Sequence, residues 1–402
     1  MRINQAVILC GGKGTRLGKL TKNLPKPMVK VSGKPFLEHL IIQLKRNGVK
    51  NIILLIGYKG EIIKRYFKAG KQFGINISYS YLPPEIDTGE RLYAIKKKLN
   101  KNFILLYSDN YTSLNLHKLN FSFQNSKKKI LLSLVNKKKG NCLFNRSNKN
   151  VSYSMNRNSN HDYVEIGYMI INPKILYYLA KKVKNLSKFL HLASKKNQVA
   201  GIEIENGYLS ISDRQRLSTA RKYFKNNDII ITDRDGVINF IPKNERYLTE
   251  PSKLKINLNL LKQIPKNARY VCISNQAGIA TGELKKVNLH KINKKIKKKL
   301  YDLRINLIDY FISYHHFNSN SYFRKPNPGM FLKAANKHKF ILDKTFYIGD
   351  DIRDIEAAYN AHTSIIYVGK KKLSYKQKMK YKFTILKKKM IKIQNDKKKF
   401  KF

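Results

Sequence analysis

The chain has 402 residues, and 82 Lys and Arg against 25 Asp and Glu give it a formal net charge of +57. This length predicts two or three domains, and a hydrophobic content of 42% is enough for a core in each. The lysines are spread along the whole chain, which is typical of a solvated basic surface. Nucleic acid is therefore not expected as a partner, although phosphorylated substrates would benefit from the positive field.

Cysteine usage and apolar stretches exclude other classes of protein. The spacing of Cys10, Cys142 and Cys272 indicates neither a disulfide framework nor a zinc site. Cys10 and Cys272 end apolar runs and are expected to be buried. No apolar stretch approaches the length of a membrane span, and residues 1–9 do not have the layout of a signal peptide. We expect a cytoplasmic protein without membrane insertion.

Short apolar runs alternate with helical patterns in both halves, which predicts an α/β fold built from βαβ units. The predicted strands of the two halves lie at residues 6–9, 52–56, 103–107, 229–232, 270–273, 307–312, 346–348 and 365–368. Residues 121–165, rich in Asn, Ser and Lys, are expected to be irregular. We predict two Rossmann-like domains in tandem, at residues 1–224 and 229–368, with a linker at 225–228 and a basic tail at 369–402.

A glycine-rich loop follows the first predicted strand. Residues 10–18 contain Gly11, Gly12 and Gly14, which let backbone N–H groups approach phosphates, and Arg16 adds positive charge. Pro-Lys-Pro-Met at 25–28 places a second cation, Lys26, in a stiff loop. A glycine-rich loop alone also fits an ordinary tight turn, so the pairing of the two loops carries the interpretation.

Together these loops resemble the motifs of sugar-1-phosphate nucleotidyltransferases, over about residues 1–222, and residues 164–169 look like the heptose-phosphate guanylyltransferase group. The resemblance implies a mixed sheet that binds Mg²⁺ and a nucleoside triphosphate, with GTP favoured. The oxygen of a sugar 1-phosphate would attack the α-phosphorus. The site residues it implies are Gly11, Gly12, Gly14 and Thr15 along the nucleotide, Arg16 and Lys26 on its phosphates, Thr88 and Gly89 near the base or sugar, and Asp109 on Mg²⁺.

Two positions depart from the pattern of these relatives. Ser210 stands where relatives place a second metal-binding acid, with Asp213 three residues further on, and Met155 follows Tyr153 and Ser154 where relatives tend to carry a lysine. An alternative interpretation is therefore a retained nucleotidyltransferase-like domain that is weak or inactive.

In the second half, the strand at 229–232 delivers Asp233 and Asp235 onto a loop at its carboxyl end, where ligands of open α/β sheets bind. Gly236 permits a turn that brings both carboxylates round one centre. One carboxylate can attack a phosphorus atom while the other transfers a proton, with Mg²⁺ screening the charge. Solvated acids at a strand end are the alternative, since such short motifs have false positives.

Three further features follow later predicted strands. Ser274 and Asn275 offer a hydroxyl and an amide to a phosphoryl oxygen. The proline-rich loop 324–330 carries Lys325, a cation that could neutralise phosphoryl charge, and Asp350 with Asp351 forms an acidic loop suited to Mg²⁺.

The four features resemble the haloacid dehalogenase-like phosphatases over about residues 226–368, and within them the histidinol-phosphate and heptose-bisphosphate phosphatase branch. The resemblance implies that Asp233 is a nucleophile that also binds Mg²⁺. Asp235 would act as general acid and base and give a backbone carbonyl to the metal. The remaining implied roles are phosphoryl binding by Ser274, Asn275 and Lys325, metal binding by Asp350 and Asp351, and a contact of Arg324 with the sugar or its second phosphate.

Members of this branch often carry a zinc loop with cysteines before the Arg-Lys-Pro motif. The corresponding stretches here, residues 313–316 and 321–323, contain no cysteine. His315 and His316 alone cannot make a four-ligand site, so no zinc is expected.

The two resemblances suggest consecutive steps on one chain. A sugar bisphosphate would lose its distal phosphate, and the remaining sugar 1-phosphate would be activated by a nucleotide. Heptose 1,7-bisphosphate fits this order, for a glycan such as lipopolysaccharide. Three alternatives stay open: a histidinol-phosphate phosphatase, a transferase for another sugar, and a nucleic-acid-binding protein.

Overall fold

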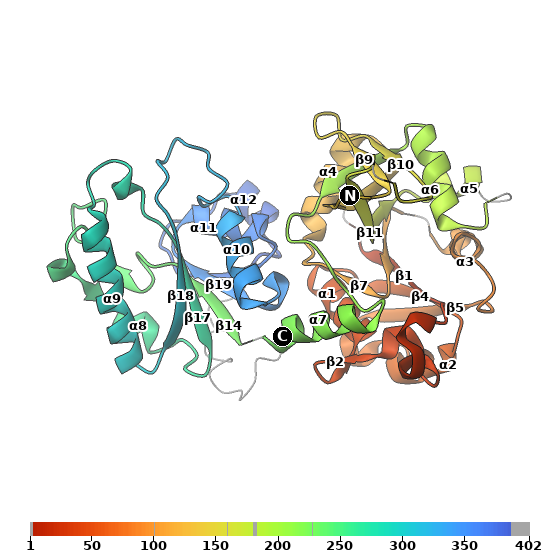
Figure 1. The fold of residues 1–402 in the computed structure, drawn as a ribbon, viewed down its shortest axis with the longest axis horizontal. Coiled ribbons are helices and arrows are strands. Elements are labelled where there is room, and N and C mark those ends of the chain that lie inside the picture. The colour runs from red at the N-terminus through yellow and green to blue at the C-terminus, as the bar shows by residue number, and fades with distance from the viewer. Residues whose placement is uncertain (1–2, 100, 159, 180–182, 227, 387–402) are drawn as a thin grey trace. The chain divides into compact units, whose positions relative to one another are not determined.

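The computed structural model describes residues 3–99, 101–158, 160–179, 183–226 and 228–386. The chain divides into two compact units, Met1–Arg221 and Lys222–Phe402 (Figure 1).

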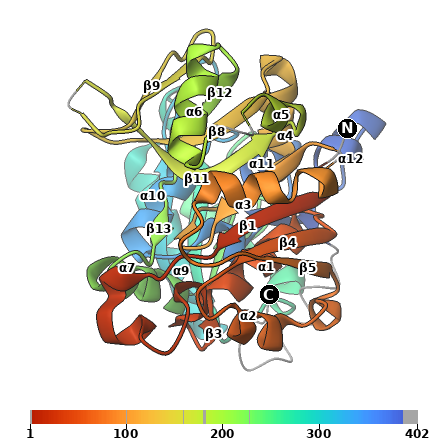
Figure 2. The same cartoon turned by 90° about the vertical axis from the view of Figure 1, so that its right-hand side faces the viewer.

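The first unit is built on a nine-stranded mixed sheet in the order β10-β9-β11-β6-β1-β4-β5, with β8 joined to β11 and β12. Strands β1, β4 and β5 lie side by side in Figure 2 and run parallel, whereas β11 is antiparallel to β6 and β8. The strands of this sheet are β1 (Gln5–Cys10), β4 (Asn51–Ile56), β5 (Asn76–Tyr81), β6 (Phe103–Tyr107), β8 (Ile130–Asn136), β9 (Cys142–Phe144), β10 (Val151–Tyr153), β11 (Tyr163–Ile171) and β12 (Val199–Glu203).

Helices cover the sheet of the first unit because its strands are apolar on both faces. All nine residues of β11 are buried, as are the inner residues of β4, which is the continuous apolar pattern of strands enclosed on both sides. The helices are α1 (Phe36–Arg46), α2 (Gly60–Phe67), α3 (Thr88–Ala94), α4 (Leu116–Ser126), α5 (Lys174–Leu179), α6 (Leu186–Lys195) and α7 (Arg214–Lys225), and the short strands are β2 (Lys30–Val31), β3 (Lys34–Pro35), β7 (Asn110–Tyr111) and β13 (Leu209–Ser210).

The second unit is built on a six-stranded sheet in the order β18-β17-β14-β19-β20-β21, in which every pairing is parallel. One apolar core lies on each face of this sheet. The strands are β14 (Ile229–Thr232), β17 (Arg269–Asn275), β18 (Asn306–Ser313), β19 (Phe346–Gly349), β20 (Ser364–Tyr367) and β21 (Ile385–Leu386), with a small ribbon of β15 (Asn239–Phe240) and β16 (Lys255–Ile256). The helices are α8 (Leu258–Leu261), α9 (Lys286–Asp302), α10 (Gly329–His338), α11 (Ile352–Asn360) and α12 (Tyr375–Lys380).

The predicted α/β class with two sheets in tandem is confirmed, with a mixed sheet first and a parallel sheet second. The expectation that residues 121–165 are irregular is wrong, because β8, β9 and β10 lie there. β8 and β9 pair with the fully buried β11, and β10 pairs with β9. Long-range pairing thus orders the short strands β9 and β10, which the local composition does not indicate. Residues 375–386, inside the segment expected to be a basic tail, form α12 and the edge strand β21.

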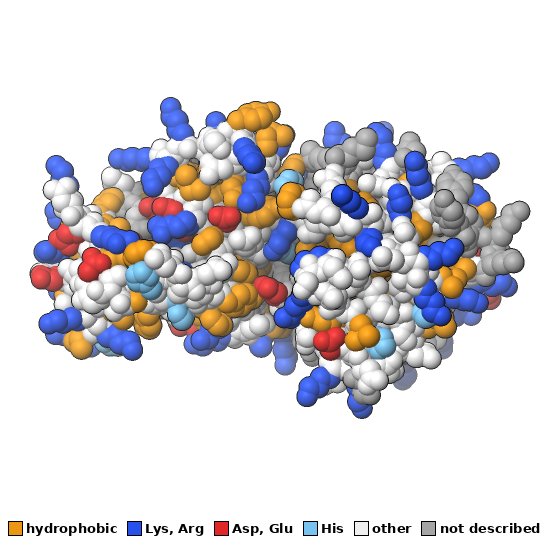
Figure 3. Space-filling view, turned by 90° about the horizontal axis from the view of Figure 1, so that it is seen from above, with side chains coloured by type: hydrophobic (Ala, Val, Ile, Leu, Met, Phe, Trp, Pro, Cys, Tyr) orange, Lys and Arg blue, Asp and Glu red, His pale blue; other side chains and the backbone are white. Residues whose placement is uncertain are grey.

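The three cysteines are buried free thiols, as expected for Cys10 and Cys272. Lys and Arg side chains lie across the visible face of each unit in Figure 3. Within the described residues, no helix is both long and apolar enough to cross a membrane.

Candidate active sites

Polar side chains of the second unit gather at the carboxyl ends of β14, β17 and β19. Asp233 follows β14, Ser274 and Asn275 end β17, and Asp350 follows β19. Gly236 lies at a φ of 81°, and a side-chain carbon there would collide with the Asp350 carboxylate. Glycine is therefore needed at this position both for the turn and for the close approach of the two loops.

Three carboxylates form one cluster at this edge. Oxygens of Asp233, Asp350 and Asp354 lie within 4.8 Å of one another, and Asp233 and Asp354 are buried. Such a set of hard oxygen donors is what Mg²⁺ prefers, so the residues fit a divalent cation. Among the described residues, this is the one group of three acidic, His or Cys side chains with that geometry.

Lys325 is the cation of the cluster. Its ammonium nitrogen Nζ lies 2.8 Å from Asp233 Oδ2 and 2.8 Å from Asp354 Oδ1, and it also donates to the Tyr347 hydroxyl at 2.8 Å. The backbone of Lys325 is fixed by the Asn275 side chain, which accepts from its N–H and donates to its carbonyl, each at 3.0 Å. Asn275 thus positions the lysine, a role that the sequence did not indicate.

The charges of the cluster shift each other's pKa. Burial raises the pKa of Asp233 well above its usual range, against the opposing effect of Lys325. Burial would lower the pKa of Lys325, but Asp233 and Asp354 together raise it. Lys325 is therefore firmly protonated, and it balances one of the carboxylates that an approaching phosphate dianion would meet.

Asp235 belongs to a neighbouring network. Its carboxylate forms an ion pair with the fully buried Arg234 at 2.9 Å and accepts from Asn239 at 2.9 Å and Gln276 at 2.7 Å. Gln276 also donates to the Ser274 hydroxyl at 2.8 Å. Burial would raise the pKa of Asp235, but Arg234 and the two amides hold it below the usual value.

The structure brings Asp354, and not Asp351, into the carboxylate cluster. Asp351 is the N-cap of α11 and forms an ion pair with Arg353 at 2.9 Å. Asp354, one turn further, accepts from the backbone N–H groups of Asp350 and Asp351 at 3.1 and 3.0 Å and from the Tyr347 hydroxyl at 2.9 Å. Sequence reasoning missed Asp354, although an acid three residues after an N-cap acid is a recognisable helix start.

Arg324 lies buried in the loop before Lys325, and it donates to the His315 carbonyl at 3.1 Å. Burial, with the nearby charges of Arg353 and Arg246, lowers its pKa. His315 and His316 lie in the same loop. Within the described residues, neither belongs to a group of three acidic, His or Cys side chains that could hold a metal ion. The absence of zinc stays a prediction.

A cavity of about 620 Å³ opens in the first unit beyond the carboxyl ends of β1 and β6. It brings together most of the residues expected there, namely Gly11, Gly12, Gly14, Thr15, Arg16, Lys26, Thr88 and Asp109. Gly89 does not line it, because its N–H is bonded to the Lys184 carbonyl at 2.8 Å and its α-carbon packs on that backbone. The glycine loop and the Lys26 loop thus face one space, although they are distinct in sequence.

Arg91 shapes one wall of this cavity and was not found from the sequence. It is buried and donates to the carbonyls of Ile56, Leu82 and Ile86 at 2.9, 3.0 and 2.9 Å, and to that of Pro83. A side-chain carbon at Gly11 would collide with the Arg91 guanidinium. Arg91 therefore ties residues 82–86 to the sheet and explains why a glycine stands at position 11.

Asp109 and Lys26 contact each other in the wall of the cavity. Lys26 Nζ forms an ion pair with Asp109 Oδ2, and both side chains are largely buried. Ser210 lies beside them, because β13 places it opposite Asn110 and the Ile211 N–H donates to the Asp109 carbonyl at 2.9 Å. The strand thus holds position 210 next to the Asp109 backbone, although Ser210 is not among the residues that line the cavity.

Other candidates for the missing groups lie elsewhere. Asp213 forms an ion pair with Arg216 at 3.3 Å, and Met155 is 52% exposed. Among the described residues, Asp109 is not part of any group of three acidic, His or Cys side chains close enough to hold one metal ion. Buried Glu165 lies behind the cavity wall, where it accepts from the Tyr107 hydroxyl at 3.1 Å, and burial raises its pKa to about 7.

Comparison with known proteins agrees with this division. Residues 5–142 match the sequence model of the nucleotidyl transferase family, and residues 227–384 match that of the polynucleotide kinase 3 phosphatase family. The chain therefore carries a nucleotidyltransferase domain followed by a haloacid dehalogenase-like phosphatase domain, and these domains indicate an enzyme.

Relatives match the first domain. A D-glycero-alpha-D-manno-heptose 1-phosphate guanylyltransferase of Campylobacter jejuni is 42% identical over 115 residues, which are 29% of this chain and 52% of the relative. A probable glucose-1-phosphate cytidylyltransferase of Bacillus subtilis is 29% identical over 219 residues, 47% of this chain and 86% of that protein. The chain thus spans about half the length of the first of these relatives.

Solved structures also align with the first domain. A putative glucose-1-phosphate thymidylyltransferase from Bacillus anthracis aligns with a TM-score of 0.49 and 17% identity, covering 54% of this chain and 93% of that one. HddC from Yersinia pseudotuberculosis, complexed with GMP-PN, aligns with a TM-score of 0.48 and 24% identity, covering 55% and 100%.

Proposed function

We propose that the chain carries out two steps of sugar-nucleotide biosynthesis. The second unit would remove the 7-phosphate of heptose 1,7-bisphosphate in a Mg²⁺-dependent reaction. The first unit would then transfer a nucleotidyl group from GTP to the heptose 1-phosphate. The observation that carries the proposal is the buried cluster in which Lys325 bridges Asp233 and Asp354.

For the phosphatase step, Asp233 would attack the phosphorus atom and form an aspartyl-phosphate while the sugar oxygen leaves. Lys325 would neutralise an oxygen of the transferring phosphoryl group. Mg²⁺ held by Asp233, Asp350 and Asp354 would supply further charge neutralisation.

Asp235 would protonate the leaving sugar oxygen and then take a proton from the water that hydrolyses the aspartyl-phosphate. Its pKa, held low by Arg234 and the amides of Asn239 and Gln276, suits the second of these tasks, because a base must be unprotonated at neutral pH. Arg324, buried beside the lysine, would contact the sugar or its second phosphate.

For the transferase step, no covalent intermediate is needed, so catalysis rests on positioning and charge neutralisation. The backbone of the loop around Gly11, Gly12 and Gly14 would cradle the triphosphate, with Arg16 and Lys26 on its charges. An oxygen of the sugar 1-phosphate would attack the α-phosphorus, and pyrophosphate would leave. Asp109 would hold Mg²⁺ together with the nucleotide phosphates.

The choice of heptose and GTP is supported by the relatives. Heptose 1-phosphate guanylyltransferases of Campylobacter jejuni and Aneurinibacillus thermoaerophilus are 42% and 35% identical over 115 and 116 residues. A phosphatase that leaves a sugar 1-phosphate produces the substrate of such a transferase. The two domains on one chain would therefore act in sequence.

Ser210 favours a second candidate function. Glu85 and Asp87 also line the cavity, but Asp109 is the acid expected to bind the metal. A site that holds Mg²⁺ through one carboxylate binds it less firmly than a site with two, so the first unit would turn over slowly or only bind its ligands. The chain would then act as a phosphatase for a sugar phosphate or histidinol phosphate.

One assay separates these candidates. The purified protein is incubated with Mg²⁺, heptose 1,7-bisphosphate and GTP, and phosphate and nucleotide sugar are both followed by mass spectrometry. Phosphate together with GDP-heptose supports the proposal. Phosphate without any nucleotide sugar, also with ATP, CTP or UTP, supports the second candidate. Release of no phosphate contradicts the proposal, and a parallel reaction with histidinol phosphate then tests the second candidate.

A further inference from the structure

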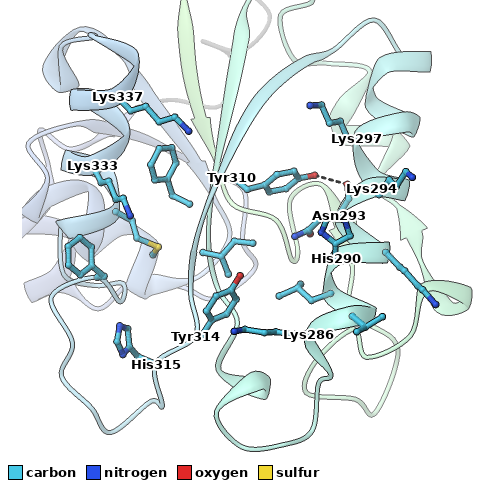
Figure 4. A pocket seen from close by; sticks show the side chains of 17 residues that line it. Lys286, His290, Asn293, Lys294, Lys297, Tyr310, Tyr314, His315, Lys333 and Lys337 are labelled. Carbon is cyan, nitrogen blue, oxygen red and sulfur yellow. Dashed lines mark hydrogen bonds between the residues drawn. The ribbon is translucent and has the colours of Figure 1, made fainter.

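A groove of about 1170 Å³ lies on the second unit beside β18, the edge strand of the parallel sheet, between α9 and α10 (Figure 4). It contains none of the carboxylates described above and not Lys325. The reaction proposed for the second unit therefore gives this groove no role.

The floor of the groove is apolar. It includes Phe311, Ile312 and Met330, with Tyr310 fixed by a hydrogen bond from its hydroxyl to the Asn293 carbonyl at 3.1 Å. Further apolar side chains along the groove are well exposed, namely Val287 at 64%, Tyr314 at 41% and Phe323 at 44%. Exposed apolar side chains that line one concave surface are typical of a binding site.

Two basic rims flank this floor. Figure 4 shows the lysines of α9 on one side of β18 and those of α10 on the other. Positions 286, 290, 294 and 297 of α9 recur at helical spacing and so share one face. The six lysines that line the groove are Lys286, Lys291, Lys294 and Lys297 from α9 and Lys333 and Lys337 from α10.

No acidic side chain is among the seventeen residues that line the groove. The neighbouring Asp309 pairs with Lys337 and His338, at 2.7 and 2.8 Å. Asp309 thus compensates the charge of Lys337, and the positive potential of the concave surface comes mainly from the lysines of α9 and from Lys333. An anionic ligand would relieve the repulsion.

We propose that this groove binds an acidic amphipathic peptide segment of a partner protein. Its apolar stripe would lie on the floor along β18, and carboxylates on both flanks would meet the rims of α9 and α10. This is the helix-in-groove mode of recognition, with charge complementarity on both sides.

Two other occupants fit less well. A second copy of this chain brings 82 basic residues against 25 acidic ones, so two copies would repel each other at this surface. Single-stranded nucleic acid binds by stacking bases on aromatic faces. Here three of the aromatic rings already have a lysine over them: Lys286 over Tyr314, Lys333 over Phe323 and Lys337 over Phe311, at 5.5, 5.9 and 5.8 Å.

The test uses a fluorescent helical peptide of about 14 residues, with Leu, Ile and Phe on one face and Glu on both flanks. Its binding to the full-length protein is measured by fluorescence anisotropy at near-physiological salt. A scrambled peptide has the same composition but no apolar face, so we expect it to bind at least about tenfold more weakly. Val287→Ser should weaken the designed peptide by roughly threefold, because it removes apolar contact without changing charge.

A matched pair of variants locates the binding. Lys294→Glu with Lys297→Glu reverses two rim charges and should weaken the peptide by about tenfold or more. Lys298→Glu with Lys299→Glu makes the same change in net charge on exposed residues of the same helix that do not line the groove, and should change affinity less than about twofold. Circular dichroism and the thermal midpoint confirm that both proteins are folded.

Three results would overturn the proposal. The first is failure of the designed peptide to bind. The second is equal binding of the scrambled peptide, or equal loss in both double variants, because net charge alone would then explain the attraction. The third is tighter binding of an oligo(dT) probe than of the peptide, if only the variant with Lys294→Glu and Lys297→Glu abolishes that binding. The groove would then be a nucleic-acid site.

Discussion

The two units place polar residues at the same structural position, the carboxyl ends of parallel strands, but equip it differently. In the second unit, three carboxylates and a buried lysine form one cluster. In the first unit, Asp109 pairs with Lys26, and Ser210 lies opposite Asn110 in the neighbouring strand. Under the proposed function, the first site would bind the phosphates of its substrates, whereas the second would carry out covalent chemistry.

This contrast follows from what each reaction requires. A covalent step needs a nucleophile, a cation and a proton carrier, so removal of one of them stops the reaction. A direct transfer between bound substrates relies on several charges and backbone N–H groups, whose contributions are partly shared. The second site should therefore fail completely on a single substitution, and the first in steps.

The largest expected effect is that of Asp233→Asn. The amide cannot form an aspartyl-phosphate, so phosphate release should fall by at least about 10³-fold. Nucleotidyl transfer to added heptose 1-phosphate should be unchanged, since Asp233 lies in the other unit. Steady-state rates of both reactions check this, and loss of both activities in a folded variant would contradict two separate sites.

Asp109→Ala should impair nucleotidyl transfer and spare phosphate release, with a smaller loss than Asp233→Asn causes. Removal of the carboxylate beside Lys26 should lower nucleotidyl transfer by about 10²-fold, an effect in the range of single electrostatic groups. Phosphate release from the bisphosphate should stay within about twofold of the original rate. An Asp109→Asn variant serves as the isosteric control and should be impaired as well if charge is what matters.

Ser210→Asp sharpens the comparison by adding the acid that the first site lacks. Because β13 holds position 210 opposite Asn110, a carboxylate there should tighten the apparent affinity for Mg²⁺ in nucleotidyl transfer by roughly tenfold. Titration of the reaction with Mg²⁺ measures this. Ser210→Asn offers a similar volume without charge, and an equal gain from it would show that the missing acid is not the limiting feature.

The smallest effect concerns pH and stability in the first unit. Burial raises the pKa of Glu165 to about 7 from an ordinary value of 4.5, so the folded state binds this proton more tightly than the unfolded state. The folded protein loses stability as pH rises between these two values, because the unfolded state ionises this carboxyl group while the folded state still holds the proton.

Glu165→Gln removes this ionisation. The variant should gain stability relative to the original protein from pH 5 to pH 8, by on the order of 2 kcal/mol. Urea unfolding followed by circular dichroism at both pH values measures the difference. A stability difference that does not depend on pH would show that Glu165 does not titrate in this range.

The fold could be predicted where strands are continuous apolar runs. β1, β4, β14 and β19 are buried on both faces, and their sequences show it directly. The three-residue strands β9 and β10 could not be predicted in the same way, because polar residues surround them and their order comes from pairing around β11. β8 does have an apolar run of its own, which the expectation for residues 121–165 as a whole missed. The pattern of apolar residues within a strand indicates that the strand is buried, but it does not indicate which other strand pairs with it.

The candidate sites show the same boundary between local and long-range information. Glycine loops, paired aspartates and Lys-Pro loops have local signatures, and the structure places Asp233, Asp350 and Lys325 together. Asp354 was missed because its role depends on a helical turn that folds it back over Asp350. Arg91 carries no motif, because its partners are backbone carbonyls, which no particular residue type marks in the sequence.

The central claim is that two separate active sites on this chain handle one intermediate in sequence. The most direct test mixes Asp233→Asn and Asp109→Ala proteins in one reaction with heptose 1,7-bisphosphate, GTP and Mg²⁺. We predict that neither variant alone forms nucleotide sugar at an appreciable rate, whereas the mixture does, because the sugar 1-phosphate released by one protein reaches the intact transferase site of the other. A mixture as inactive as its components, although both proteins are folded, would contradict the account.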